Sequence, residues 1–178
     1  MENFIVNFNY DIFLQLIIIV LGTIVVAQIV TFVLAFIGKK IVHKTATEID
    51  DKIIDLFKSP IFYTIVLSGI YVALRILFFG EFIKDFSLPF FQTILAIMWS
   101  VFFVKFIKLL FEHFAETPKV KFVTIHTLPL FLNTSFIIIW AVSIYLMFGI
   151  WGINMTAWLA SAGVAGIAIG FAAKDTLA

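Results

Sequence analysis

The C-terminal part of the sequence contains the stretch that decides the fold, FIIIWAVSIYLMFGIWGINMTAWLASAGVAGIAIGFAA, residues 136–173. This stretch lies in a longer run, residues 122–173, that contains no Asp, Glu, Lys or Arg. A membrane-crossing helix uses ~20 to 25 residues, so the run is too long for one crossing and must fold back on itself. The segment GIWGIN, residues 149–154, offers two glycines and an asparagine for a tight turn. The run therefore predicts two consecutive transmembrane helices.

The composition of the whole chain also indicates a lipid environment. Of 178 residues, 63% are hydrophobic and only 13% are charged. A protein surface in water takes roughly a quarter of all residues as charges, so a soluble globular domain is excluded. The absence of cysteine excludes disulfides, cysteine zinc sites and cysteine nucleophiles. A net charge of +1 gives no reason to expect nucleic acid as a partner.

Three further apolar stretches precede this run, at residues 12–38, 61–80 and 86–104. No Lys or Arg stands ahead of the first stretch, so we expect a retained span and not a cleaved signal peptide. The sequence therefore predicts an all-α integral membrane protein with five transmembrane helices, of which the last is the richest in small residues.

The basic residues predict the orientation of these helices. One side of the predicted topology carries ten lysines: Lys39, Lys40, Lys44, Lys52, Lys58, Lys105, Lys108, Lys119, Lys121 and Lys174. The other side carries Lys84 and Arg75. We expect Arg75 to anchor to lipid headgroups. Because cytoplasmic loops carry the excess of Lys and Arg, we expect the N-terminus outside and the C-terminus in the cytoplasm, in the inner (cytoplasmic) membrane.

The charged linker between the first two spans has a pattern of its own. The spacing Thr45-x-x-Glu48 is typical of a capping box, and the apolar residues that follow it, up to Phe57, fall on one helical face. Residues 45–58 therefore suit a short amphipathic helix at the cytoplasmic interface. They equally suit a solvated connector whose apolar residues touch neighbouring spans, and the sequence leaves both open.

The last predicted span differs from the others in its side chains. Eleven of the seventeen residues 157–173 are Gly, Ala or Ser, which let helix backbones approach closely, as in Gly166-x-x-x-Gly170. Such a helix suits the centre of a monomeric bundle, and it equally suits a ring of identical copies around a pore. In a ring, Ile167 and Phe171 share one helical face and would form two stacked apolar constrictions that close by dewetting.

The segment GVAGIAIGFAAKDTLA, residues 163–178, resembles the pore-helix signature of the small-conductance mechanosensitive channel family (MscS-like). The segments NMTAWLASA, residues 154–162, and TATEIDDKIIDLF, residues 45–57, also resemble stretches of that family. The resemblance implies a symmetric homo-oligomer, a homoheptamer, opened by membrane tension and releasing ions and small solutes on hypo-osmotic shock. It further implies a member with five transmembrane helices per subunit, two of them extra peripheral helices.

The resemblance also assigns site residues. It implies that Ile167 and Phe171 are the hydrophobic pore gate, and that Lys174 and Asp175, in place of a more usual neutral pair, lie at the pore mouth. Val164 stands where a smaller residue is often found. The small residues through which adjacent pore helices would pack are Ala160, Gly163, Gly166, Ala168 and Gly170.

The resemblance divides the chain into two parts. Residues 1–120 would be peripheral lipid-facing helices, and residues 121–178 the channel core. The family continues with a second half of the pore helix and a cytoplasmic vestibule, so we expect the present chain to be truncated after the first half of that helix.

The residues give no indication of catalysis. No paired carboxylates occur within a span, no glycine-rich phosphate loop follows a strand, and His43, His113 and His126 lack ligand spacing. We expect no enzyme, no metal and no cofactor, and expect membrane lipids and further copies of the chain as partners. The alternatives are a subunit of a secondary transporter and a non-conducting membrane scaffold. A transporter would show inverted repeats and broken helices, which the two halves lack.

Overall fold

The structure, a computed structural model, describes residues 10–42, 48–77, 81–116, 124 and 126–177. These residues form five helices and no strand, which confirms the predicted all-α class. The helices are α1 (Tyr10–Val42), α2 (Glu48–Leu77), α3 (Glu81–Glu116), α4 (Leu128–Ile150) and α5 (Thr156–Leu177).

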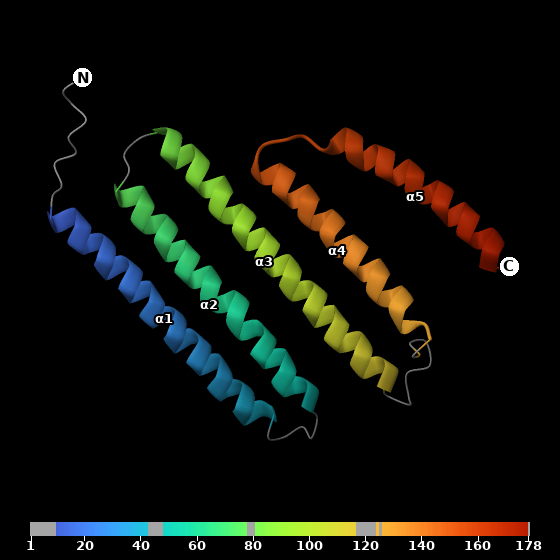
Figure 1. Cartoon of the computed structure of the whole chain (residues 1–178), viewed down its shortest axis with the longest axis horizontal. Coiled ribbons are helices and arrows are strands. Elements are labelled where there is room, and N and C mark those ends of the chain that lie inside the picture. The colour runs from blue at the N-terminus through green and yellow to red at the C-terminus, as the bar shows by residue number, and fades with distance from the viewer. Residues whose placement is uncertain (1–9, 43–47, 78–80, 117–123, 125, 178) are drawn as a thin grey trace.

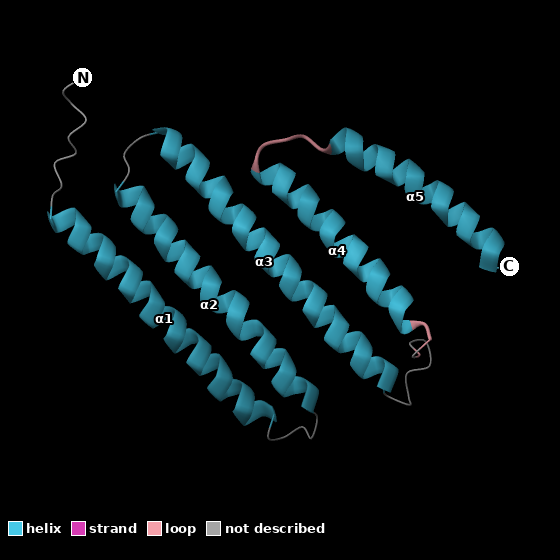
Figure 2. Cartoon of the chain, viewed as in Figure 1, coloured by secondary structure: helices cyan, strands magenta, loops and turns pink. Residues whose placement is uncertain are grey.

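The helices lie side by side in a row and alternate in direction (Figure 1). Between the described residues, contacts join α1 to α2, α2 to α3 and α3 to α4, and no contact joins α5 to another helix. Figure 2 shows that nearly all of the described chain is helical and that a loop separates α5 from α4. The row is therefore one helix thick, which leaves both of its faces open.

Four of the helices are long and apolar enough to cross a membrane, through the segments Phe13–Gly38, Ile49–Ile76, Asp85–Glu116 and Leu128–Ile150. The apolar part of α5 is shorter, Thr156–Ala172. The whole of α5 has 22 residues and rises ~33 Å at ~1.5 Å per residue, enough for the ~30 Å hydrocarbon core. The chain is a multi-pass membrane protein with four apolar spans and a fifth helix.

The helices extend further than the apolar stretches indicated. The second helix already begins at Glu48, so residues 48–58 are its first turns and not the separate short amphipathic helix that we considered. Phe57 contacts the ring of Phe102 on α3 at a centroid distance of 4.6 Å, and with Ile53 it faces a cavity shared with α1. The apolar residues of this segment thus touch neighbouring spans, as the alternative expected, but as part of a long helix and not of a solvated connector. Thr45 of the proposed capping box lies outside the described residues.

The third helix likewise continues beyond the apolar stretch that ends at residue 104. It runs to Glu116 and includes Lys105 and Lys108. Charges end an apolar stretch without ending a helix, because the backbone hydrogen bonds continue past the hydrocarbon boundary while the lysine heads reach toward water. Hydropathy therefore located the membrane segments and underestimated the helices.

Close backbone approach holds α1 against α2. Ala27 of α1 is 0% exposed, and Ala73 of α2 is also buried. A Cβ added to Gly69 of α2 would lie only 2.2 Å from Cγ2 of Thr23 on α1, so no side chain fits between the two helices there. Small residues permit such close packing in a membrane. Because lipid is itself apolar, burying apolar side chains between helices adds little stability there.

Hydroxyl groups link α3 to both of its neighbours. Trp99 of α3 donates its Nε1–H to Oγ1 of Thr64 on α2 at 3.2 Å, and Ser100 of α3 is hydrogen-bonded to Ser143 of α4. Both serines are buried. The third helix, α3, is thus held to α2 on one side and to α4 on the other by hydrogen bonds, which lipid hydrocarbon cannot form with these groups.

Substitution of Gly69 tests the α1–α2 contact. We expect Gly69→Ala to lower the free energy of unfolding by ~1–3 kcal/mol, because the new methyl group overlaps the short, branched side chain of Thr23. The measurement is unfolding by SDS titration in mixed micelles. Gly22→Ala is the control, since nothing lies within 4 Å of its Cβ position, and helix propensity alone should make it neutral or slightly stabilising. Equal stability of the two variants would contradict the close contact.

Candidate functional site: the exposed helix α5

The fifth helix has no neighbour within the described part of the chain. Every side chain from Thr156 to Ala172 is exposed. A Cβ added to Gly163, Gly166 or Gly170 would meet nothing within 4 Å. Small residues, which permit close packing, are therefore concentrated on the one helix that packs against no other described helix.

The predicted gate residues lie on this helix, one turn apart. Ile167 is 62% exposed and Phe171 is 67% exposed, and Val164 continues the same face one turn earlier. Ile169, 69% exposed, points to the opposite side of the helix because it lies two positions from each of them. A pore constriction needs these side chains to face their counterparts from other helices. A single chain supplies only one such helix, so a constriction requires more than one copy.

The other predicted pore residues are equally open. Ala160 and Ala168 are exposed along α5, as is Lys174 in its last turn. Asp175 belongs to the same helix, and its side chain lies outside the described part of the structure. Their roles in packing and at the pore mouth stay predictions, because no second copy is present to contact them.

The turn that precedes α5 forms where GIWGIN predicted it. Gly152 adopts φ +70°, a left-handed conformation that favours glycine. The amide of Ile153 donates to the carbonyl of Phe148 at 2.9 Å, which closes the C-terminal end of α4. Two residues before α5, Asn154 accepts a hydrogen bond from the backbone amide of Thr156 at 2.9 Å, which satisfies one free N–H at the helix start.

The same turn is fastened to α3. Trp151 donates its Nε1–H to Oγ1 of Thr93 on α3 at 3.0 Å, and its ring meets Phe86 edge-on at a centroid distance of 5.3 Å. The sequence did not reveal this contact, because it joins residues 58 positions apart. The hydroxyl of Thr93 is a weak local signal, because α3 also contains Ser87 and Ser100. The position at which α5 leaves the row is therefore set by α3.

Arg75, the predicted headgroup anchor, lies in the last turn of α2. Its Nη1 donates to the hydroxyl of Tyr71 at 3.0 Å, and its Cζ lies 5.8 Å from the centre of that ring. The guanidinium remains exposed, so its other donors can reach phosphate groups at the membrane surface. Anchoring of Arg75 to headgroups stays a prediction.

The histidines do not form a site within the described residues. His113 lies in α3 and His126 in the turn before α4, and no group of three His, Asp or Glu that could hold a metal occurs there. His43 lies outside the described residues.

Comparison with known proteins places α4 and α5 in a recognised context. The family model described as "Mechanosensitive ion channel, transmembrane helices 2/3" matches residues 133–174, which cover most of both helices. Over these residues the chain is similar to the MscS-like channels. The matched residues include the turn at Gly152 and the exposed face of α5.

Two curated relatives extend this similarity over most of the chain. An uncharacterised MscS family protein of Aquifex aeolicus is 29% identical over 89% of this chain and 43% of its own length. The small-conductance mechanosensitive channel MscMJ of Methanocaldococcus jannaschii is 29% identical over 90% of this chain and 47% of its own length. The chain thus spans less than half the length of these relatives. No solved structure matches it significantly.

The open glycine positions lead to a test of what covers them. We expect Gly166→Leu to reduce the assembled oligomer by about tenfold in a nanodisc or detergent, because added bulk at a helix contact costs ~1–3 kcal/mol. Size-exclusion chromatography with light scattering measures the assembly. Gly22→Leu, an equally open glycine on α1, is the matched control and should assemble normally. Normal assembly of Gly166→Leu would mean that this face of α5 meets lipid or water.

Proposed function

We propose that the chain is the membrane part of a mechanosensitive channel subunit, opened by membrane tension and passing ions and small solutes on hypo-osmotic shock. The observation that carries the proposal is α5, a helix of small residues that contacts no other helix among the described residues. Several copies placed around an axis would cover its glycines with one another and its remaining face would line a pore. By the MscS-like resemblance the assembly is a homoheptamer.

Within that pore, Ile167 and Phe171 would form the gate. Each copy contributes one apolar side chain at each of two levels, so a symmetric assembly has two stacked apolar rings. Water leaves a narrow apolar constriction, and ions cannot cross a dewetted segment. Ala160, Gly163, Gly166, Ala168 and Gly170 would supply the contacts between neighbouring pore helices. Their small size permits the backbone approach that a narrow closed state requires.

In this channel, residues 1–120 with α1, α2 and α3 would form the peripheral, lipid-facing part. Residues 121–178 with α4 and α5 would form the channel core. The first helix contacts only α2 among the described helices and exposes large apolar side chains such as Phe32 and Phe36. Such a surface suits contact with acyl chains. Tension can open the channel only if the open state differs from the closed state in its interaction with the membrane, for example in area. A row one helix thick offers an extended surface for that interaction.

The charges support one orientation in the inner membrane. The start of α2 and the ends of α3 and α5 lie at the same edge of the row (Figure 1). Among their residues are Lys52, Lys105, Lys108 and Lys174. By the excess of positive charge in cytoplasmic segments, this edge would face the cytoplasm and the N-terminus the outside. Lys174 and Asp175 would then lie at the cytoplasmic mouth of the pore.

The gate is tested in the full-length protein by patch recording under graded suction. We expect Ile167→Ser and Phe171→Ser each to lower the opening threshold and to add a leak in the closed state, because a hydroxyl allows water into the constriction. Ile169→Ser is the matched control, since Ile169 is as exposed as Ile167 and lies on the opposite face of α5. It should leave the threshold near that of the unmodified protein.

Two outcomes would contradict the proposal at different levels. Unchanged threshold and leak in both gate variants would show that the gate does not lie on this face of α5, and the proposed channel activity would still stand. A monomer in nanodiscs would contradict the channel activity itself, because one copy of α5 cannot enclose a pore. That result would favour a transporter or scaffold.

A further inference from the structure

Trp151, in the turn between α4 and α5, contacts α3 on both sides of a proline. Its Nε1–H bonds to Oγ1 of Thr93, which follows Pro89, and its ring meets that of Phe86, which precedes Pro89. Proline has no amide proton, so the carbonyl of Asp85 loses its donor and the helix is weakened there. Trp151 therefore spans a point at which α3 bends more easily than a regular helix.

Side-chain contacts join α3 to α4 at successive levels along their length. Near one end, the ring centroids of Phe111 and Phe131 lie 5.4 Å apart. Near the middle, Ser100 is hydrogen-bonded to Ser143. The indole bond of the turn follows at the other end. Because these levels hold the two helices in one register, we expect α3, α4 and the turn to move together.

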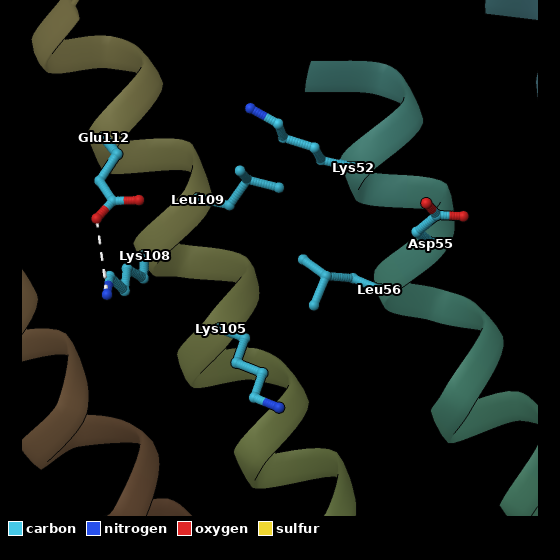
Figure 3. A pocket seen from close by; sticks show the side chains of 7 residues that line it. All are labelled: Lys52, Asp55, Leu56, Lys105, Lys108, Leu109 and Glu112. Carbon is cyan, nitrogen blue, oxygen red and sulfur yellow. Dashed lines mark ion pairs between the residues drawn. The ribbon is translucent and has the colours of Figure 1, made fainter. Parts of the chain in front are cut away.

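The C-terminal part of α3 has room to move against α2. A cavity of about 480 Å³ lies between the two helices there, and Figure 3 shows Leu56 and Leu109 extending into it from opposite sides. Nearer its middle, α3 is held to α2 by the bond from Trp99 to Thr64. A tilt that narrows the cavity would turn α3 about this middle contact and displace its N-terminal part, to which the turn is fastened.

The turn itself can pass such a displacement on to α5. It is short, and hydrogen bonds close both of its ends, from the amide of Ile153 to the carbonyl of Phe148 and from the amide of Thr156 to Asn154. Because α5 contacts no other described helix, nothing in the described row holds it back when the turn moves.

We propose that Trp151 is a positioning residue for the pore helix, which transmits tilting or bending of α3 to the start of α5 and so couples the lipid-facing helices to the gate. The indole suits this role because its N–H gives a directional bond while its ring edge makes a separate aromatic contact. The inference rests on the proposed function, since α5 is a pore helix only in the assembled channel.

The test is patch recording of the full-length protein at the tension that opens half of the unmodified channels. Trp151→Phe keeps a ring against Phe86 and removes the N–H. We expect it to lower the ratio of open to closed channels by about fivefold, the order of one neutral hydrogen bond, because α5 can then stay closed while α3 tilts. Thr93→Val should cause the same loss, whereas Thr93→Ser keeps a hydroxyl and should preserve the ratio.

A double variant and a matched control separate coupling from a structural role. Trp151→Phe combined with Thr93→Val should lose no more than either variant alone, because both changes remove the same bond. Trp99→Phe removes an equivalent bond, between α2 and α3, which the rings of Phe57 and Phe102 also join. Unfolding by SDS titration should show a similar loss of stability in Trp99→Phe and Trp151→Phe, while Trp99→Phe leaves the open ratio unchanged.

Three results would overturn the inference while the unmodified channel still opens under tension, so that the proposed function stands. Equal ratios in Thr93→Val and Thr93→Ser would show that the bond does not influence the gate, a comparison that holds even if Trp151→Phe fails to assemble. Additive losses in the double variant would show that the two residues act separately. An equal loss in Trp99→Phe would indicate a general effect of weakened packing. Absence of tension-activated current in the unmodified protein would instead contradict the proposed function, and this inference with it.

Discussion

Hydrocarbon cannot hydrogen-bond the backbone, and the rest of this structure follows from that constraint. Each crossing segment must satisfy its own N–H and C=O groups, which makes it a helix. Nor can helices associate by burying apolar side chains, because lipid is as apolar as they are. Among the described hydrophobic residues, the buried ones are accordingly few: Ala27, Ala73 and Phe102. The row is joined by close approach at small residues and by hydrogen bonds between hydroxyls, as at Gly69 and Ser100.

Three hydrogen bonds between described residues link α3 to other parts of the chain, which makes it the central element of the described row. They join Trp99 to Thr64, Ser100 to Ser143, and Thr93 to Trp151. The threonines can take part because each donates its hydroxyl proton to a carbonyl four residues earlier in its own helix, Thr64 to Pro60 and Thr93 to Pro89. Each oxygen is then free to accept an indole N–H, from Trp99 of α3 or from Trp151 in the turn after α4. Each tryptophan thereby contacts a hydroxyl of another helix, which fixes the register without a large buried area.

The sequence predicted the features that depend on local physics. A charge-free run longer than one crossing requires a turn, and the glycines of GIWGIN locate it, as Gly152 confirms. Hydropathy could not predict the full length of α2 and α3, because Lys58 precedes the apolar stretch of α2 and Lys105 follows that of α3 while each helix continues past the charge. Pairing of Ser100 with Ser143 was also beyond the sequence, since nothing local indicates which hydroxyls of different helices will face each other. The pore residues stay predictions because their partners lie in other copies of the chain.

The connection between α5 and the row decides how a force on the peripheral helices could reach a pore. Among the described residues α5 touches no other helix, so its link to the row runs through the turn after α4. Trp151 ties that turn to Thr93 on α3, beside Pro89, where the missing amide proton weakens the ladder of helix hydrogen bonds. In the proposed channel, a tilt of α3 under tension would therefore move the start of α5 directly. The exposed glycines of α5 would let neighbouring copies slide past one another while the rest of the row keeps its polar contacts.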